Sequence, residues 1–166
     1  TPEKISEIIR PNIERKIFKC LEIARDEAIP VYLQKEKMTN LHFDDRLILA
    51  GDPALPVFRF ERHKDHSTYS LSLDSGGNAI SLIKGGTEII CMSPCILREN
   101  RNIFFVSDVD GVKLKPFFTR NSIIIPQKTE EKYFAGFVLN AVNNYPVTGS
   151  GFRIKEAEPD KEALLT

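Results

Sequence analysis

Apolar residues recur every three or four positions near the start of the chain and every second position later on. An apolar stripe at helical spacing runs over residues 13–24, which predicts an amphipathic helix. Thr1 and Pro2 fit the cap and first position of an earlier helix. Because proline disfavours a helix interior, Pro11 predicts a break, with Asn12 capping the second helix.

From Pro56 onward the apolar period changes from 3.6 to 2. Phe58 and Phe60 alternate with charged neighbours, and such alternation is typical of half-buried strands. Glycine- and asparagine-rich turn signals separate these segments, so neighbouring strands should pair as an antiparallel meander. The expected strands span residues 31–34, 56–62, 68–73, 79–83, 87–91, 95–97, 102–107, 112–117 and 122–125.

A helix with clear start and stop signals follows the strands. Thr129 fits its N-cap, and Glu130 and Glu131 fall where the helix dipole favours acids. The apolar face over residues 133–142 must pack on something, and the meander is the available partner; "GSGFRI" (149–154) adds a last strand. The sequence therefore predicts an α+β fold, an antiparallel β meander braced by a C-terminal amphipathic helix, with N-terminal helices.

The 166 residues fit one domain with an appendage. We expect residues 1–50 to form a helical N-terminal segment packed on the main domain, and residues 51–155 to form the meander-plus-helix domain. The polar, acidic stretch 156–166 is typical of a linker to the rest of a longer chain. The start at "TPEK" without methionine also suggests a piece of a longer protein.

Composition limits the function classes. Lys plus Arg equals Asp plus Glu at 23 each, whereas domains that depend on nucleic acid usually carry a basic excess. This balance argues against strong autonomous DNA binding but leaves a local basic patch open. No apolar run is long enough to span a membrane, and the stretch "TPEKISEIIRPN" (1–12) contains no apolar signal region. Three cysteines fit a reducing compartment, so we expect a cytoplasmic protein without a membrane partner.

Few residues carry the pattern of a reactive or metal site. Cys91 and Cys95 have no second pair with zinc-ligand spacing and are expected to be small buried side chains. His63, Asp65 and His66 could bind a divalent metal, but a tight turn directs such side chains into water. We therefore expect no metal, cofactor or evident small-molecule substrate on this segment.

Three glycine-containing segments could be interpreted as ligand-binding loops, but each also fits an ordinary turn between strands. "DSGGN" (74–78) and "KGGT" (84–87) lack the spacing of a phosphate-binding loop and fit hairpin turns. "SDVDG" (107–111) has one glycine of a calcium loop but lacks its aspartate spacing and later glutamate, and fits a turn between strands.

Basic side chains gather around "KLKPFFTR". Lys113 and Lys115 fall on one face of the expected strand and Arg120 follows the phenylalanine pair, while Arg98 and Arg101 lie in the preceding hairpin turn. Such a cluster could hold a nucleic-acid backbone and stack bases. It could equally be a solvated strand whose edge lysines prevent aggregation. Both interpretations stay open.

The segments "DGVKLKPFF", "IIIPQKTEEKYFAGFVLNAV" and "GSGFRI" resemble the accessory region upstream of the motor in bacterial Swi/Snf-type helicases. Members of that region have a "dG-K-LKPFL" strand, an "IP" stop, an "EEKYF" helix start and a closing "GF" strand. The resemblance covers about residues 56–155, and its sharp part is about forty residues. This sequence departs from the pattern at two places, with "PFF" for "PFL" and "QK" for the usual basic "R-S". The second departure weakens the case for phosphate binding at that turn.

The resemblance implies that the parent chain is an ATP-driven translocase on double-stranded DNA. ATP and Mg would bind to its motor lobes, because this segment has no "GxxxxGK[ST]" and no "DExH". The segment itself would then be a non-catalytic accessory domain that contacts DNA or regulates the motor lobes of the same chain. If this segment contacts DNA, we expect the basic side chains described above, Lys113, Lys115, Arg120, Arg98 and Arg101, to make the contact.

Two other function classes stay open. A protein–protein interaction module with no nucleic-acid role would dock through the meander face or the N-terminal helices, and the neutral net charge favours it. A small hydrolase or metal enzyme would use His63, Asp65 and His66.

Overall fold

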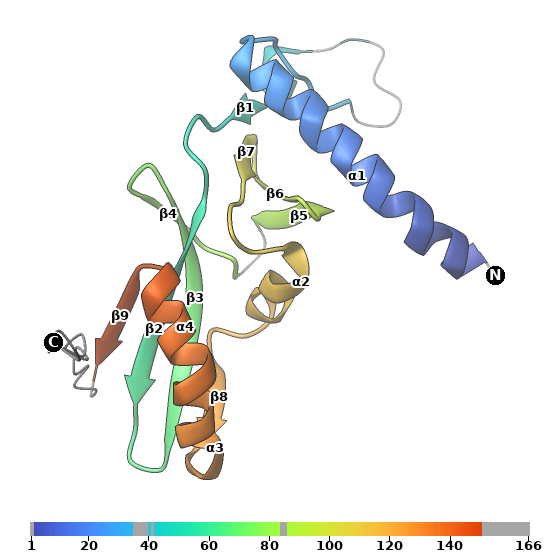
Figure 1. The fold of residues 1–166 in the computed structure, drawn as a ribbon. Coiled ribbons are helices and arrows are strands. Elements are labelled where there is room, and N and C mark those ends of the chain that lie inside the picture. The colour runs from blue at the N-terminus through green and yellow to red at the C-terminus, as the bar shows by residue number, and fades with distance from the viewer. Residues whose placement is uncertain (1, 35–39, 41, 84–85, 151–166) are drawn as a thin grey trace, which may run out of the picture.

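The computed structural model describes residues 2–34, 40, 42–83 and 86–150 as two β-sheets with helices (Figure 1). The strand order of the four-stranded sheet is β1-β7-β6-β5, and that of the five-stranded sheet is β4-β3-β2-β9, with β8 also on β3. The first sheet comprises β1 (Ile48–Leu49), β5 (Thr87–Met92), β6 (Cys95–Glu99) and β7 (Asn102–Phe105). The second comprises β2 (Leu55–Arg62), β3 (His66–Ser75), β4 (Asn78–Ile80), β8 (Ile123–Pro126) and β9 (Val147–Ser150).

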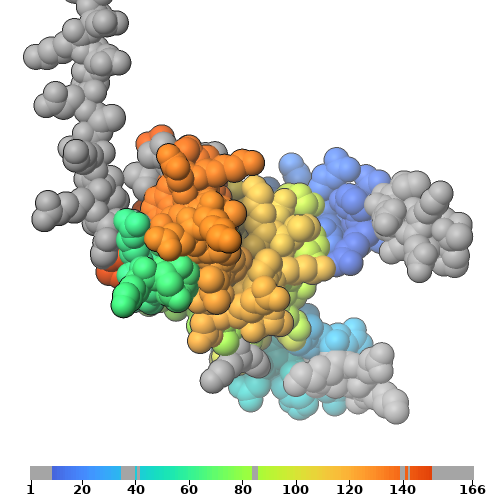
Figure 2. All heavy atoms as spheres, turned by 90° about the horizontal axis from the view of Figure 1, so that it is seen from below, coloured from blue at the N-terminus to red at the C-terminus, as the bar shows by residue number. Residues whose placement is uncertain are grey.

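The helices lie at both ends of the chain and between the strands. They are α1 (Pro2–Asp26), the 3₁₀ turn η1 (Phe43–Asp45), α2 (Gly111–Leu114), the 3₁₀ turn η2 (Lys115–Phe118), α3 (Gln127–Tyr133), the π segment η3 (Phe134–Val138) and α4 (Leu139–Asn144). In Figure 2, α1 (blue) and the α3–α4 region (orange) lie on opposite sides of the view. The α+β class predicted from the sequence is confirmed.

An aromatic layer joins the C-terminal helix to the five-stranded sheet. Phe137 packs edge-on against Phe58, with ring centroids 5.7 Å apart, and lies 5.2 Å from Tyr69. The Tyr133 hydroxyl donates to the Tyr69 hydroxyl at 3.0 Å. Buried aromatic pairs contribute stability beyond the area they bury, so this helix braces the sheet as the sequence predicts.

Strand β6 belongs to two cores at once. Cys95 and Leu97 point into the main core, which includes the aromatic layer, whereas Ile96 joins a second core on the opposite face. All three side chains are buried, because successive residues of a strand face opposite sides of the sheet. The four-stranded sheet is therefore covered on both faces, and α1 contributes the cover of the second core.

The pairing departs from a simple meander. Sequence neighbours pair antiparallel in β2–β3, β3–β4, β5–β6 and β6–β7, as expected. However, β1 pairs with β7 and β9 with β2 in parallel, and the strand order changes sheets between β4 and β5. Parallel pairing needs a long connection, and turn signals between sequence neighbours cannot reveal it.

The expected strand at 112–117 is wrong. This segment forms α2 and η2, and Asp110 caps it by accepting the Lys113 backbone N–H at 3.1 Å. Leu114 and Phe117 are buried three residues apart, whereas Val112 is 64% exposed. The residues that enter the core are thus separated by a helical spacing. The alternation of Val112 and Leu114 with lysines resembles a strand pattern but does not reflect burial on one face.

The expected helix break at Pro11 is also wrong, because α1 continues through it from Pro2 to Asp26. Proline removes one backbone hydrogen bond and crowds the preceding turn. The Arg10–Glu14 ion pair, at 2.7 Å, spans this position and ties the turns on both sides together. Asn12 caps no helix; its Oδ1 accepts from Arg15 Nη2 at 3.1 Å.

Smaller expectations are corrected at element ends. Helix α3 begins at Gln127 with Pro126 as N-cap, and Thr129 Oγ1 instead donates to the Pro126 carbonyl at 3.1 Å. The segment 31–34 forms one isolated bridge, between Tyr32 and Arg46. The last strand ends at residue 150, so the remainder of "GSGFRI" and the expected linker 156–166 lie outside the described residues.

Of the three glycine-containing segments, one forms the expected hairpin turn, one does not, and one lies partly outside the described residues. Gly76 and Gly77 have positive φ values of 59° and 84° in the β3–β4 hairpin, as expected for a tight hairpin turn. The "SDVDG" segment leads into α2 and does not connect two strands. Residues 84–85 of "KGGT" lie outside the described residues.

Gly111→Ala is expected to lower the free energy of unfolding by about 1–2 kcal/mol through overpacking. A Cβ at this position would lie 2.8 Å from Met92 Sδ and 3.1 Å from Ile89 Cγ2, so α2 would have to move away from β5. Gly136→Ala is the matched control, since nothing lies within 4 Å of its Cβ position and helix propensity favours alanine by about 0.5–1 kcal/mol. Urea denaturation of both variants measures the difference, and equal effects would contradict the close α2–β5 contact.

Candidate functional site

One buried carboxylate fixes α1 to the edge of the four-stranded sheet. Glu14 is 6% exposed, and its Oε2 accepts the backbone N–H groups of Met92 at 2.9 Å and Ser93 at 3.2 Å. Strand β5 is an edge strand, so its outward N–H groups have no further strand to bond. Arg10 Nε donates to Glu14 Oε1 at 2.7 Å, so both carboxylate oxygens have partners.

The charge of Glu14 is stabilised despite its burial. Removal from water, the largest single influence, raises the pKa of Glu14. The hydrogen bonds from Arg10 and from the Ser93 and Met92 N–H groups act in the opposite direction. Together with the Arg10 charge they outweigh burial, and the pKa of Glu14 lies below its usual value.

Apolar packing adds to this anchor along the next two turns of α1. Ile17, Phe18 and Leu21 pack on the second core, whose buried members are Cys91, Ile96, Ile103 and Phe105. Phe18 meets the Phe105 ring edge-on with centroids 5.4 Å apart, and the Arg25 guanidinium lies 4.6 Å from the centre of the same ring. Helix α1 is thus fixed along one side from Glu14 to Arg25.

The other side of α1 exposes apolar residues. Of the ten large apolar side chains that are exposed among the described ones, seven lie between residues 9 and 48. We call these seven the N-terminal apolar surface: Ile9, Ile13, Ile23, Ile29, Tyr32, Phe43 and Ile48. Helical geometry places Ile9, Ile13 and Ile23 along one side of α1, away from Phe18 and Leu21. In Figure 1 the N-terminal half of α1 extends away from both sheets.

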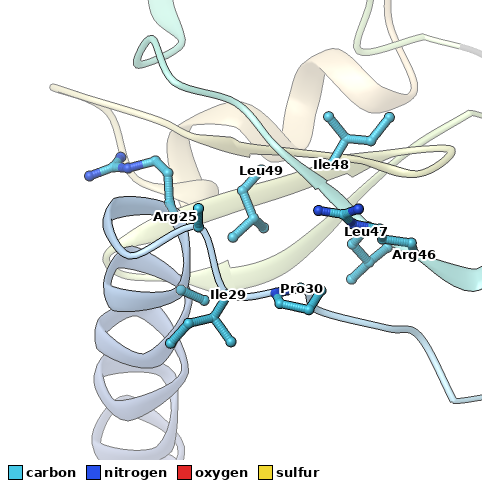
Figure 3. A pocket seen from close by; sticks show the side chains of 9 residues that line it. Arg25, Ile29, Pro30, Arg46, Leu47, Ile48 and Leu49 are labelled. Atoms are coloured by element: carbon cyan, nitrogen blue, oxygen red, sulfur yellow. The ribbon is translucent and has the colours of Figure 1, made fainter.

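A pocket of about 290 Å³ lies where α1 ends and the chain returns toward β1 (Figure 3). Its apolar walls include Ile29, Pro30, Leu47 and Leu49, and Arg25 and Arg46 also line it. The pocket therefore combines an aliphatic lining with cationic side chains.

The structure separates the five predicted nucleic-acid-binding residues into two groups. Arg98 and Arg101 lie in the β6–β7 hairpin and are paired with acids: Arg98 Nη2 lies 2.6 Å from Glu88 Oε1, and Arg101 Nη1 lies 3.8 Å from Asp44 Oδ1. Strand register brings Arg98 opposite Glu88. Their charges are thus partly neutralised within the protein.

The second group is Lys113, Lys115 and Arg120, on or directly after α2 and η2. All three are exposed, and none forms an ion pair within the described part of the chain. Lys113 and Lys115 lie on the helical segment that replaces the expected strand, and Arg120 follows it.

The histidine turn has local partners. His66 Nδ1 lies 2.7 Å from Asp65 Oδ1, and His63 Nε2 lies 3.2 Å from Thr68 Oγ1. The hydrogen bond from His66 is the main cause that lowers the pKa of Asp65. No group of three or more potential metal ligands occurs among the residues that the structure describes.

The two central cysteines are buried on opposite faces of the four-stranded sheet. Cys91 belongs to the second core and Cys95 to the main core, which confirms the prediction of buried side chains. Burial raises the pKa of Cys91 to about 11 and that of Cys95 to about 12. Both groups are therefore neutral thiols at neutral pH, unlike the thiolate that nucleophilic chemistry requires.

Sequence reasoning missed a polar cluster between β3 and α3. The buried Ser67 hydroxyl donates to Glu130 Oε1, and Arg62 Nη2 lies 3.4 Å from Glu130 Oε2. Residues 67 and 130 are 63 positions apart, so no local pattern could have paired them. A shallow pocket of about 280 Å³ borders this cluster and is lined by Arg62, Glu130 and Phe134 among others. The cluster joins the C-terminal helix to the sheet.

Comparison with family models, curated proteins and solved structures finds no match for this chain. Among the described helices, none combines the length and the apolar character that crossing a bilayer requires.

Glu14→Gln is expected to lower the free energy of unfolding at pH 7 by about 1–3 kcal/mol, because a charged acceptor of two backbone N–H groups is lost. Since the folded-state pKa of Glu14 is lowered, its contribution is present above the unfolded-state pKa and disappears as pH falls through the folded-state value. The difference between wild type and variant should therefore shrink from about pH 5 to about pH 3.

Denaturant titrations at pH 7, 5 and 3 test this, with Glu27→Gln as control. Glu27 is exposed and lies just beyond α1, so its substitution should change stability by less than about 0.5 kcal/mol. A difference for Glu14→Gln that stays constant with pH would contradict the assigned role of the carboxylate.

Proposed function

We propose that this chain is a non-catalytic accessory domain that works by docking, with the N-terminal apolar surface as its contact face. The partner we propose, from the resemblance to the region upstream of bacterial Swi/Snf-type motors, is the motor lobes of the same parent chain. The observation that carries the docking proposal is the location of seven of the ten exposed large apolar side chains between residues 9 and 48.

The location of these side chains is more informative than their number. Single exposed apolar residues are normal on any protein surface, whereas apolar residues that share one side of a helix, as Ile9, Ile13 and Ile23 do on α1, can form a contact face. Helix α1 holds Ile9 and Ile13 in a fixed position because Glu14 and Phe18 anchor the adjoining turns. A pre-positioned apolar face loses little conformational entropy on binding, which favours association.

Charge supports a protein partner as the main one. The chain has equal numbers of basic and acidic residues, and two of its candidate DNA-contacting arginines are paired internally. Counterion release from DNA needs basic side chains that are free to approach phosphates. Docking through apolar contacts makes no such demand.

Replacing Ile9 and Ile13 together by serine is expected to weaken binding to the separately produced motor lobes by about ten- to a hundredfold. Each buried apolar anchor contributes about 1 kcal/mol or more to an interface, and 1.4 kcal/mol corresponds to a factor of ten. Isothermal titration calorimetry measures the affinity, and circular dichroism verifies that the variant keeps its fold.

Ile124→Ser is the matched control, because Ile124 on β8 is 64% exposed and lies outside the N-terminal apolar surface. It should bind like wild type. Absence of any wild-type binding would refute the motor as partner, and unchanged binding of the double variant would refute the N-terminal apolar surface as contact face.

A second candidate function is direct contact with double-stranded DNA through Lys113, Lys115 and Arg120. Exposure of all three and the absence of internal ion pairs among the described residues favour it. Three such cations could neutralise neighbouring phosphates without base-specific contact.

Under this second function, Lys113→Ala should weaken binding to duplex DNA equally for all sequences and lower the salt slope by about one. Arg101→Ala is the control, since the Asp44 side chain already accompanies that arginine, and it should leave the slope unchanged. Fluorescence anisotropy of labelled duplexes at several salt concentrations measures both. A wild-type protein that shows no salt-dependent binding at low ionic strength would eliminate the DNA contact and leave the docking proposal intact.

A further inference from the structure

The pocket at the end of α1 has rigid walls. Leu47 N donates to the Val31 carbonyl at 2.8 Å, and Ile48 N donates to the Arg101 carbonyl at 2.8 Å. On the opposite wall, Ile29 N donates to the Ala24 carbonyl at 2.8 Å. The walls are therefore tied to α1 on one side and to the four-stranded sheet on the other, so the pocket exists before any ligand arrives.

The size and lining of the pocket define the ligand's apolar part. About 290 Å³ falls at the lower end of the range for ligand pockets and accommodates one or two side chains. Ile29 and Ile48 are 52% and 51% exposed, so apolar area remains to be covered. Leu47 and Leu49 lie deeper and join the second core. An aliphatic or aromatic side chain would bury this area.

The charges of the pocket define the ligand's polar part. Among the residues that line it, the ionisable side chains are Arg25 and Arg46, both cationic. Asp26 neutralises part of the Arg25 charge at 2.8 Å, and in Figure 3 the Arg25 guanidinium points away from the other labelled side chains. Arg46 is exposed, has no ion pair with another described residue, and lies beside Leu47 and Ile48 in the same view. Arg46 is thus the cation available to an incoming carboxylate.

We infer that this pocket binds a segment of a partner protein in which a bulky apolar residue lies next to an aspartate or glutamate. The apolar side chain enters between Ile29 and Leu47, and the carboxylate pairs with Arg46. This inference rests on the proposed docking function and specifies the chemistry that the partner brings to one part of the N-terminal apolar surface. A phosphate or a nucleic acid would satisfy Arg46 but leave the aliphatic walls uncovered.

The test uses the 166-residue chain and three capped synthetic peptides. The first is acetyl-Glu-Glu-Leu-Leu-Glu-amide, the second replaces each Glu by Gln, and the third replaces each Leu by Ser. In ¹H–¹⁵N NMR titrations, the first should shift amides of residues 29 and 46–49, and the other two should bind at least about fivefold more weakly. Equal binding of the charge-free peptide, or shifts confined to other residues, would overturn the inference.

Arg46→Ala should weaken binding of the first peptide roughly fivefold, the upper range for a partly exposed ion pair. Arg59→Ala is the matched control on β2, where the arginine pairs with Glu61 at 2.8 Å, and it should bind like wild type. Unchanged affinity of Arg46→Ala would overturn the carboxylate contact.

The two proposals can fail separately. Motor binding that is lost in the Ile9/Ile13 double variant but unaffected by Arg46→Ala, with no peptide binding, would overturn the pocket inference alone. Peptide binding at the pocket without any binding of the motor lobes would overturn the proposed partner alone.

Discussion

The carboxylate of Glu14 is the interaction on which the position of α1 depends. It accepts the N–H groups of Met92, the last residue of the edge strand β5, and of Ser93, in the turn that follows. Unpaired N–H groups at a sheet edge need a partner, and this contact supplies one while it fixes the helix. Arg10 keeps the buried charge balanced and ties the helix together across Pro11.

This anchor explains why one side of α1 exposes apolar residues. The four-stranded sheet needs cover on its second face, and Ile17, Phe18 and Leu21 supply it. One helix can turn only one side toward a sheet, so Ile9, Ile13 and Ile23 are left toward solvent. The pocket beside Arg46 lies at the C-terminal end of α1, because the chain must leave α1 there and return to form β1. On α1, one side of the helix therefore covers the sheet, and the opposite side contributes Ile9, Ile13 and Ile23 to the candidate docking face.

The sequence pattern predicted the features that depend on neighbouring residues, such as helices, strands and turns. It did not predict the contacts between residues that are distant in the sequence. The change from helical to alternating spacing gave the α+β class and most strands correctly. The segment 112–117 was mistaken for a strand because Val112 and Leu114 alternate with lysines, although the Asp110 cap and the buried Leu114–Phe117 spacing indicate a helix. The role of Glu14 could not be predicted from the sequence, because its partner Met92 is 78 residues away. The internal pairing of Arg98 likewise depends on strand register, which the sequence does not reveal.

Native-state hydrogen exchange of the Met92 and Ser93 amides tests most directly whether Glu14 fixes α1 to the edge of β5. If it does, both amides are protected at neutral pH and open with the same free energy as the central turns of α1, around Phe18. Unprotected exchange of these two amides, with Ile96 and Leu97 of the neighbouring strand still protected, would contradict the anchor and with it the fixed position of the N-terminal apolar surface.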